Sequence, residues 1–224
     1  MKLNQWETNS NEQLLAFLVG DYYGEKPENQ IDAIKRSKEE RAAFLVDKLK
    51  LTSELNVLEI GSGMGYTSKH IAKQVKQLHC CDISSSFLKQ ALEECRDIPN
   101  IFFHKIDKTG KLPGEDHSLD VIYSDAVFIH LNLYDIFWYF SEFKRLAKDG
   151  GVVWFNIMDP AVKPMSKLIE MAEYYKADRS TLKNLLCWNS LEAVVHTASH
   201  FGFALQSKEL DINLDLKFIK TALE

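Results

Sequence analysis

Short apolar runs alternate with helical stretches from residue 56 onward, and this alternation restricts the fold more than any other feature of the sequence. The runs expected to form strands are Val57–Ile60, Leu78–Cys81, Ile101–Phe103, Leu119–Tyr123 and Val152–Ile157. The stretches expected to form helices are Thr67–Val75, Ser86–Cys95 and Leu133–Leu146. Strands that are apolar on both sides are typical of a parallel sheet whose two faces are covered by helices. Right-handed crossovers then favour an α/β fold with a doubly wound sheet.

The end of the chain adds a different pattern to this sheet. Phe203–Leu210 and Leu214–Leu223 read as strands with no helix between them, and Asp211–Asn213 supplies a turn. Two strands joined in this way form an antiparallel hairpin. We therefore expect a mostly parallel, seven-stranded sheet with helices on both faces, completed by a C-terminal antiparallel hairpin.

Two segments lie outside this alternation. Residues 1–52 carry only helical signals, a short apolar helix over Leu14–Val19 and a longer helix over about Gln30–Lys50. The apolar face of the longer helix is expected to comprise Ile31, Ile34, Ala42, Leu45 and Leu49. We expect residues 1–52 to form a helical lid segment on a single α/β domain that spans residues 53–224. Residues 160–188 are longer than one crossover helix needs, so we expect an insertion there that covers the ligand site.

The helix after this insertion has recognisable ends in the sequence. Asn189 and Glu192 are three residues apart and form a pattern similar to a capping box. Gly202 follows Phe201 at the place where the helix is expected to stop, because glycine readily takes the left-handed conformation found there.

The charge of the chain disfavours a nucleic-acid partner. The 224 residues fit one large domain, and the formal net charge is −5. Binding to a nucleic-acid backbone needs a concentrated positive surface. The densest basic stretch, residues 35–41, is interrupted by Glu39 and Glu40 and indicates a solvated helix face.

The cysteines and histidines favour neither disulfides nor a metal site. The four cysteines are Cys80, Cys81, Cys95 and Cys187. They form no C-x-x-C pair, which suits reduced thiols in a cytoplasmic protein. His196 and His200 are four residues apart on a predicted helix, but neither an H-E-x-x-H motif nor a third ligand accompanies them. Because the sequence shows no signal peptide and no apolar run of membrane-spanning length, we expect a cytoplasmic protein without a metal and without a membrane partner.

A glycine-rich loop follows the first predicted strand. Gly61, Gly63 and Gly65 occupy alternate positions directly after Ile60, and a predicted helix begins after them. Glycine permits a tight turn and leaves room for a ligand against the backbone, while the first N–H groups of the helix face the same space. A turn that merely needs glycine explains one such residue more easily than three at alternate positions. The pattern therefore predicts a ligand site at the carboxyl end of this strand.

The spacing of these glycines restricts the kind of ligand. A dinucleotide-binding loop has the pattern G-x-G-x-x-G, whereas Tyr66 stands here in place of its third glycine. No Gly-Lys-Ser/Thr follows, so the loop is not a Walker A motif either. The run Val57–Gly65, an apolar strand with Glu59 before G-x-G-x-G, resembles the first motif of the class I S-adenosylmethionine-dependent methyltransferases. The resemblance covers about residues 54–157, where Arg145–Gly151 is similar to the turn before the family's fifth strand, and implies a Rossmann-like methyltransferase fold with S-adenosylmethionine as cofactor.

The resemblance also implies which residues contact this cofactor. Asp82 takes the place of the family's ribose-binding carboxylate, although it could instead only cap a helix. Asp107 takes the place of a group that reaches the adenine amino nitrogen, although it could instead only shape a turn. Ile83 and Phe87 stand where the family packs apolar side chains on adenine, and Glu59 is expected to orient the loop or to meet the methionine ammonium group. The full set of expected cofactor contacts is Glu59, Gly61, Gly63, Gly65, Asp82, Ile83, Phe87, Asp107, Lys108 and Ser124.

The acceptor side of the expected site lies in residues 124–131, after the fourth predicted strand. This segment resembles the small-molecule branch of the family, and it lacks the Asn-Pro-Pro-aromatic and Pro-Cys motifs of the nucleobase branches. His130 is the candidate general base or acceptor-orienting residue, with a histidine bonded to a backbone carbonyl as the alternative. Asp125 is a second catalytic candidate, with a helix cap as its alternative. Tyr22 and Tyr23 are candidates for lining the acceptor pocket, with turn aromatics on the surface as the alternative.

These residues together predict in-line methyl transfer to an oxygen, nitrogen or carbon atom of a small-molecule acceptor, with S-adenosylhomocysteine as the product. Two other functions stay open at this point. One is a protein or peptide methyltransferase, and the other is a cofactor-binding protein that has lost catalysis. A nicotinamide oxidoreductase ranks last, because the glycine spacing differs from its fingerprint.

Overall fold

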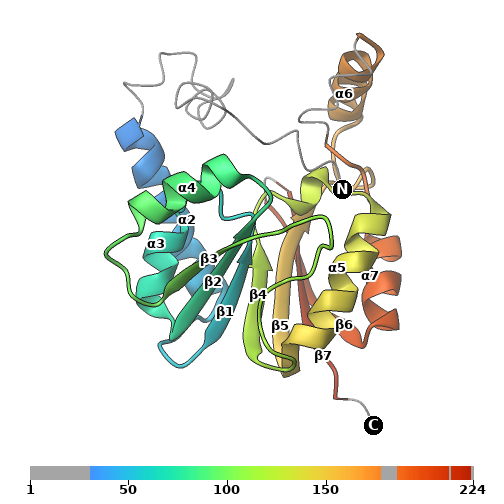
Figure 1. The fold of residues 1–224 in the computed structure, drawn as a ribbon. Coiled ribbons are helices and arrows are strands. Elements are labelled where there is room, and N and C mark those ends of the chain that lie inside the picture. The colour runs from blue at the N-terminus through green and yellow to red at the C-terminus, as the bar shows by residue number, and fades with distance from the viewer. Residues whose placement is uncertain (1–30, 178–185, 212, 223–224) are drawn as a thin grey trace. The chain divides into compact units, whose positions relative to one another are not determined.

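The structure is a computed structural model that describes residues 31–177, 186–211 and 213–222. Its seven strands form one sheet in the order β3-β2-β1-β4-β5-β7-β6 (Figure 1), which confirms the predicted α/β fold. The strands are β1 (Asn56–Ile60), β2 (Gln77–Asp82), β3 (Ile101–Lys105), β4 (Leu119–Ser124), β5 (Ala147–Ile157), β6 (Phe203–Leu210) and β7 (Leu214–Lys220). The helices are α2 (Ile31–Leu49), α3 (Ser68–Ile71), α4 (Ser85–Glu94), α5 (Leu133–Leu146), α6 (Met165–Ala177) and α7 (Leu191–His200), with the 3-10 turns η4 (Ala72–Gln74) and η5 (Phe128–His130).

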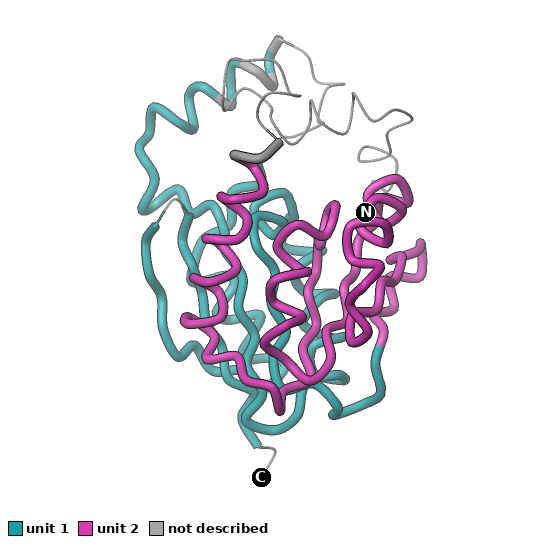
Figure 2. Tube along the Cα trace, turned by 90° about the vertical axis from the view of Figure 1, so that its left-hand side faces the viewer, with its two compact units in different colours: residues 1, 114–224 teal, residues 2–113 magenta. Residues whose placement is uncertain are grey.

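The directions of the strands agree with the predicted topology. β1 pairs with β2, β2 with β3 and β4 with β5 in parallel, whereas β7 is antiparallel to both β5 and β6. The C-terminal hairpin is therefore confirmed. The chain divides into two compact units (Figure 2), in which unit 2 holds residues 2–113 and unit 1 holds residues 114–224 together with residue 1.

The first described helix of unit 2 is the longer helix predicted from the N-terminal segment. Four of the five residues expected on the apolar face of α2 are buried: Ile34, Ala42, Leu45 and Leu49. The side chain of the fifth, Ile31, lies outside the described residues, as does the predicted helix Leu14–Val19. Residues 35–41 are exposed or half-buried, as expected for a solvated helix face.

The first crossover differs from the single helix predicted over Thr67–Val75. α3 ends at Ile71, and the three residues of η4 follow before β2 begins. The side-chain amide of Asn100 donates to the carbonyls of Ala72 and Val75 at 2.7 and 2.9 Å. Asn100 precedes β3, so a residue distant in sequence satisfies carbonyls at the end of this helix. No local pattern could have shown this termination.

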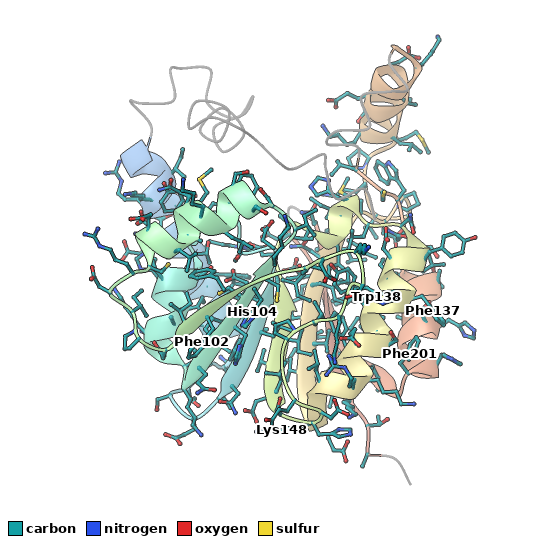
Figure 3. The ribbon with its side chains drawn as sticks, viewed as in Figure 1. Phe102, His104, Phe137, Trp138, Lys148 and Phe201 are labelled. Atoms are coloured by element: carbon teal, nitrogen blue, oxygen red, sulfur yellow. The ribbon has the colours of Figure 1, made fainter. Side chains whose placement is uncertain are left out.

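Aromatic side chains fill the core of unit 1. α5 has the predicted bounds, and its N-terminus carries a capping box between Asn132 and Asp135. Phe140 of this helix is fully buried, and its ring centroid lies 5.5 Å from that of Phe218 on β7. Phe137 and Phe201 lie edge to face near the surface, with centroids 4.8 Å apart (Figure 3). These contacts fix α5 and the end of α7 in relation to the hairpin strand β7.

The helix that follows the insertion has a different cap from the one predicted. Ser190 is the N-cap of α7, because its hydroxyl accepts from the N–H of Ala193 at 3.2 Å. Asn189 is buried, and its Nδ2 donates to the carbonyl of Leu131 at 2.8 Å. The capping-box prediction is therefore wrong, since a tertiary contact uses the Asn189 side chain. Gly202 has a φ of +82° and ends the helix as expected.

β5 begins earlier than predicted, at Ala147 instead of Val152. Leu119 of β4 pairs with Ala147, and Val121 pairs with Val152, so the residues of β5 between these two pairs form an irregularity in the ladder. Gly150 lies in this irregularity with a φ of +76°. Gly150 and Gly151, which the resemblance placed in the turn before this strand, thus lie inside it, in the irregular part of the ladder.

The predicted insertion contains a helix of its own. α6 lies within residues 160–188, and residues 178–185 of the insertion lie outside the described residues. Its expected role as a cover for the ligand site stays a prediction. Over the described part of the chain, none of the helices is both long enough and apolar enough to cross a membrane.

Lys220, at the end of β7, is buried with 3% of its surface exposed. Its Nζ donates to the carbonyls of Ala147 and Lys144 at 2.7 and 3.1 Å. It also lies 3.0 Å from Nδ1 of His117 and 3.5 Å from a carboxylate oxygen of Asp149. A buried ammonium group is tolerated here because these groups replace its water.

We expect Lys220→Met to lower the free energy of unfolding by about 2 kcal/mol, because buried carbonyls then lose their donor. Urea denaturation followed by circular dichroism measures this as a lower midpoint with an unchanged slope. Lys208→Met, on an exposed lysine of β6, is the matched control and should leave the midpoint unchanged. Equal midpoints for the Lys220 variant and the wild type would contradict the structural role of Lys220.

Candidate functional site

The glycine loop joins β1 to α3 in a conformation that only glycine adopts readily. Gly61, Gly63 and Gly65 have φ angles of +82°, +54° and +79°. The N–H groups of Gly61 and Ser62 donate to the carbonyl of Cys81 at 2.7 and 3.2 Å, which anchors the loop to the end of β2. Positive φ angles are strained for residues with a Cβ, so the backbone itself requires these glycines.

Gly63 and Gly65 face different surroundings. A Cβ on Gly65 would lie 3.0 Å from Sγ of Cys95 and 3.2 Å from Cβ of Ala91. A Cβ on Gly63 would have no atom of the described residues within 4 Å. Gly65 thus serves the close packing of the loop on α4. Gly63 borders open space, where a ligand can approach the backbone.

Asp82 connects the end of β2 to this loop. It is 6% exposed, and its two carboxylate oxygens accept separate backbone hydrogen bonds. Oδ2 accepts from the N–H of Gly63 at 2.9 Å, and Oδ1 accepts from the N–H of Ser84 at 2.8 Å. The helix cap anticipated as the alternative role of Asp82 is instead provided by Ser84, the N-cap of α4, and Asp82 accepts from the N–H of this capping residue. The contact with Gly63 places a carboxylate against the glycine loop, as the expected cofactor site requires.

Glu59 is a second buried carboxylate, with 5% of its surface exposed. It is the penultimate residue of β1, just before the loop. Its Oε2 accepts from the hydroxyl of Ser68 and from the thiol of Cys80, the latter at 3.3 Å. Burial, followed by the neighbouring Glu59, raises the pKa of Cys80 well above its usual range, so the thiol keeps the proton that it donates. Because Ser68 begins α3 and Cys80 lies on β2, these hydrogen bonds connect the end of β1 to α3 and to β2. This geometry supports its predicted role in orienting the loop.

Ser62 is a polar residue of the loop that sequence reasoning missed. Its hydroxyl oxygen is buried, and none of the described residues forms a hydrogen bond with it. A buried hydroxyl without a partner costs about 1–3 kcal/mol, so the Ser62 hydroxyl is available to a group outside the described residues, such as a ligand or a water molecule. A serine between the first two glycines was the signal in the sequence that could have identified it.

The two apolar candidates for adenine packing lie in different environments. Phe87 is buried in a core cluster with Ile34 of α2 and with Met64 and Tyr66 of the glycine loop. Ile83 is half-buried at the end of β2. Phe87 therefore packs against side chains of the loop, and Ile83 keeps more of its surface exposed than Phe87 does. The contact of either residue with adenine stays a prediction.

Asp107 and Lys108 lie after β3 and are exposed. Oδ1 of Asp107 accepts from the N–H of Thr109 at 2.8 Å and also from its hydroxyl. These hydrogen bonds lower the pKa of Asp107, with the Thr109 hydroxyl as the larger cause. The turn anticipated as its alternative role is therefore present, and the contact of Asp107 with adenine stays a prediction.

The candidates from the segment after β4 lie in unit 1. Ser124 is buried at the end of the strand, and Asp125 is half-buried. Asn156 of β5 donates from Nδ2 to Oδ1 of Asp125 at 3.0 Å and accepts from the N–H of Ala126 at 3.0 Å. Ala126 has a φ of +59°, a strained conformation for alanine. Asn156 therefore fixes both the backbone of this segment and the Asp125 carboxylate, a role that no local pattern revealed.

The other end of this segment, around η5, carries His130 and is held by the chain that returns from the insertion. The N–H of Cys187 donates to the carbonyl of Ile129 at 2.7 Å, and its thiol donates to the carbonyl of His130 at 3.3 Å. Asn189 donates to the carbonyl of Leu131, as described above. Three successive carbonyls are thus occupied, which holds the backbone of the candidate base in one position. The ring of His130 is half-buried.

Tyr22, Tyr23 and His200 are further residues that the sequence singled out. Tyr22 and Tyr23 lie outside the described residues. His200 stacks on Phe137 with ring centroids 5.9 Å apart. Throughout the described ranges, no group of three or more histidine, cysteine, aspartate or glutamate side chains is placed to hold a metal ion.

Known proteins are similar to this chain in fold and, over part of its length, in sequence. Residues 57–151 match the family model described as a methyltransferase domain. Magnesium protoporphyrin IX methyltransferase from Synechocystis PCC 6803, solved with bound SAH, superposes with a TM-score of 0.67 at 16% identity, over 93% of this chain and 94% of that one. Residues 57–151 are therefore a methyltransferase domain, and the fold around them is that of the class I S-adenosylmethionine-dependent methyltransferases.

Two curated relatives match part of the chain. Phosphoethanolamine N-methyltransferase 1 from Caenorhabditis elegans is 24% identical over 137 residues, which is 59% of this chain and 29% of that protein. The tRNA N(3)-cytidine methyltransferase METTL2 from Danio rerio is 32% identical over 110 residues, 46% of this chain and 31% of that protein. The chain thus spans about three tenths of the length of these two relatives.

We expect Gly65→Ala to destabilise the protein more than Gly63→Ala does. Both substitutions strain a positive φ, at a cost of about 1 kcal/mol, but only the Gly65 variant also forces a Cβ against α4. Chemical denaturation of the two variants, without any ligand, measures the difference. Equal free energies of unfolding would contradict the assignment of Gly65 to packing and of Gly63 to the open side of the loop.

Proposed function

We propose that this protein transfers a methyl group from S-adenosylmethionine to a small-molecule acceptor by in-line displacement. The observation that carries the proposal is the contact between Gly63 and Asp82, which sets a buried carboxylate beside the open side of the glycine loop. This arrangement combines the backbone, the charge and the space that a nucleoside with vicinal hydroxyl groups needs.

The residues around this contact fit the cofactor. Gly61, Gly63 and Gly65 shape the loop, and Asp82 is the proposed ribose-binding carboxylate. The buried hydroxyl of Ser62, which has no partner among the described residues, is the polar group that a bound ligand would satisfy. The further proposed contacts are Glu59, Ile83, Phe87, Asp107, Lys108 and Ser124. When bound, S-adenosylmethionine supplies a methyl group on a sulfonium, which is an excellent leaving group.

The proposed acceptor side is the segment of residues 124–131, which is held by Asn156 at one end and by Cys187 and Asn189 at the other. His130 is proposed to take a proton from the acceptor atom if that atom carries one, or else to orient the acceptor. Asp125 is proposed to hold the acceptor through its carboxylate. Tyr22 and Tyr23 remain proposed lining residues of the acceptor pocket. Alignment of the acceptor and exclusion of water then account for most of the rate.

A small molecule is the favoured acceptor because of the charge of the chain and because of one relative. The net charge is −5, and no concentrated basic stretch occurs in the sequence. The Caenorhabditis elegans relative is named for phosphoethanolamine, a small amine. The Danio rerio relative is named for cytidine in tRNA, so an RNA acceptor is the second candidate. The four cysteines are free thiols, which supports the proposed cytoplasmic location.

The proposal is tested first by calorimetric titration with S-adenosylhomocysteine, with NAD in a parallel cell. Micromolar binding of S-adenosylhomocysteine alone is the expected result, and binding of NAD alone would replace the proposal with an oxidoreductase. Transfer of labelled methyl groups to a panel that contains phosphoethanolamine, other small amines and acids, peptides and tRNA then identifies the acceptor class. Tight cofactor binding without transfer to any of them would favour the non-catalytic alternative.

We expect Asp82→Ala to weaken S-adenosylhomocysteine binding by about 2 kcal/mol, because charge-assisted hydrogen bonds to the ribose are lost. Asp97→Ala is the matched control, since the Asp97 side chain is 91% exposed and lies in the loop after α4. Calorimetry with the folded variants measures both dissociation constants. An unchanged constant for the Asp82 variant would remove this carboxylate from the site.

We expect His130→Ala to leave the dissociation constant of S-adenosylhomocysteine nearly unchanged and to lower turnover by about a hundredfold, if His130 is the general base. His200→Ala, which changes a histidine at the end of α7, is the control and should retain full turnover. Steady-state rates with the acceptor found in the panel provide the measurement. Unaltered turnover of the His130 variant would make this histidine a structural residue.

A further inference from the structure

Two side chains of the glycine loop, Met64 and Tyr66, pack against helices of unit 2. Met64 and Tyr66 are 3% and 6% exposed, and they form one core cluster with Phe87 of α4 and Ile34 of α2. The backbone of the loop is therefore held by two buried side chains as well as by Asp82. Ile34 lies in the first turn of α2, so the N-terminal end of this helix covers the buried side of the loop.

Charged side chains from three helices surround the ring of Tyr66. Nζ of Lys35 lies 5.5 Å from the ring centroid, and Nζ of Lys69 lies 5.7 Å from it. Glu94 joins both lysines, with one carboxylate oxygen 2.5 Å from Nζ of Lys69 and the other 3.7 Å from Nζ of Lys35. Lys35 belongs to α2, Lys69 to α3 and Glu94 to α4, so a single carboxylate links all three helices.

The charged groups of this network are partly shielded from solvent, which strengthens the contacts between the three helices. The side chains of Lys69 and Glu94 are 19% and 16% exposed, and that of Lys35 is 38% exposed. Burial and, after it, the charge of Glu94 raise the pKa of Tyr66, so the ring stays neutral and offers its face to both ammonium groups. Two lysines on one ring would repel each other, and Glu94 offsets that repulsion.

We propose that Tyr66, Lys35 and Glu94 are positioning residues of the cofactor site, which couple the docking of α2 to the conformation of the glycine loop. The proposal rests on the proposed function. Cofactor affinity then depends on helix α2, although none of the proposed cofactor contacts lies on this helix. By thermodynamic reciprocity, cofactor binding must stabilise the docked end of α2 to the same extent.

The first test compares S-adenosylhomocysteine affinities of Glu94→Gln, Lys35→Met and the wild type by calorimetry. Both variants are expected to bind about tenfold more weakly, because a partly buried charged contact is lost. Asp47→Asn is the matched control, since it removes a carboxylate from an exposed ion pair at the far end of α2, and it should bind as the wild type does. Wild-type affinity in both Glu94→Gln and Lys35→Met would overturn the coupling.

The second test needs no variant and is therefore independent of whether a variant folds. Hydrogen exchange of the wild-type protein is followed with and without saturating S-adenosylhomocysteine. Amides of residues 34–38 are expected to gain protection together with the loop, whereas those at the far end of α2, residues 45–49, should not change. Protection confined to the loop would overturn the proposal. Failure of the wild type to bind S-adenosylhomocysteine would overturn the proposed function itself, so the two failures are distinguishable.

Discussion

The contact between the Asp82 carboxylate and the N–H of Gly63 is the interaction on which the proposed cofactor site depends. Three elements meet at this carboxylate: the end of β2, the glycine loop and the start of α4. The loop has three positive φ angles and few side chains of its own, so it needs an acceptor from a neighbouring strand to hold its N–H groups in place. A carboxylate is the strongest such acceptor available to a protein.

A second buried carboxylate, Glu59, lies on the strand beside Asp82. β1 and β2 are paired in parallel, with Glu59 opposite Cys80, so the two acids come together at the carboxyl ends of adjacent strands. Burial of a carboxylate is unfavourable unless donors surround it, and here hydroxyl, thiol and backbone donors do so. Both carboxylates are thus held by donors from the elements around the glycine loop.

In unit 1, hydrogen bonds hold the segment of residues 124–131, which contains no glycine. Ala126 takes a left-handed conformation because Asn156 accepts from its N–H and donates to Asp125. The carbonyls around His130 are occupied by the chain that returns from the insertion. A strained residue held by a neighbouring side chain, together with carbonyls held by a distant segment, is typical of segments whose side chains must be presented in one orientation.

The sequence by itself determined the fold and the glycine loop. Alternating apolar strands and helices can bury their faces in few ways, and three glycines at alternate positions encode a backbone that other residues cannot follow. Only the tertiary structure decided which hydrogen-bond partners the polar side chains have. Asn100, Asn156 and Asn189 each bind backbone groups far away in the sequence, and the Ser62 hydroxyl is left without a partner among the described residues. Hydrogen-bond partners depend on which segments meet in space, and that information is absent from any local pattern.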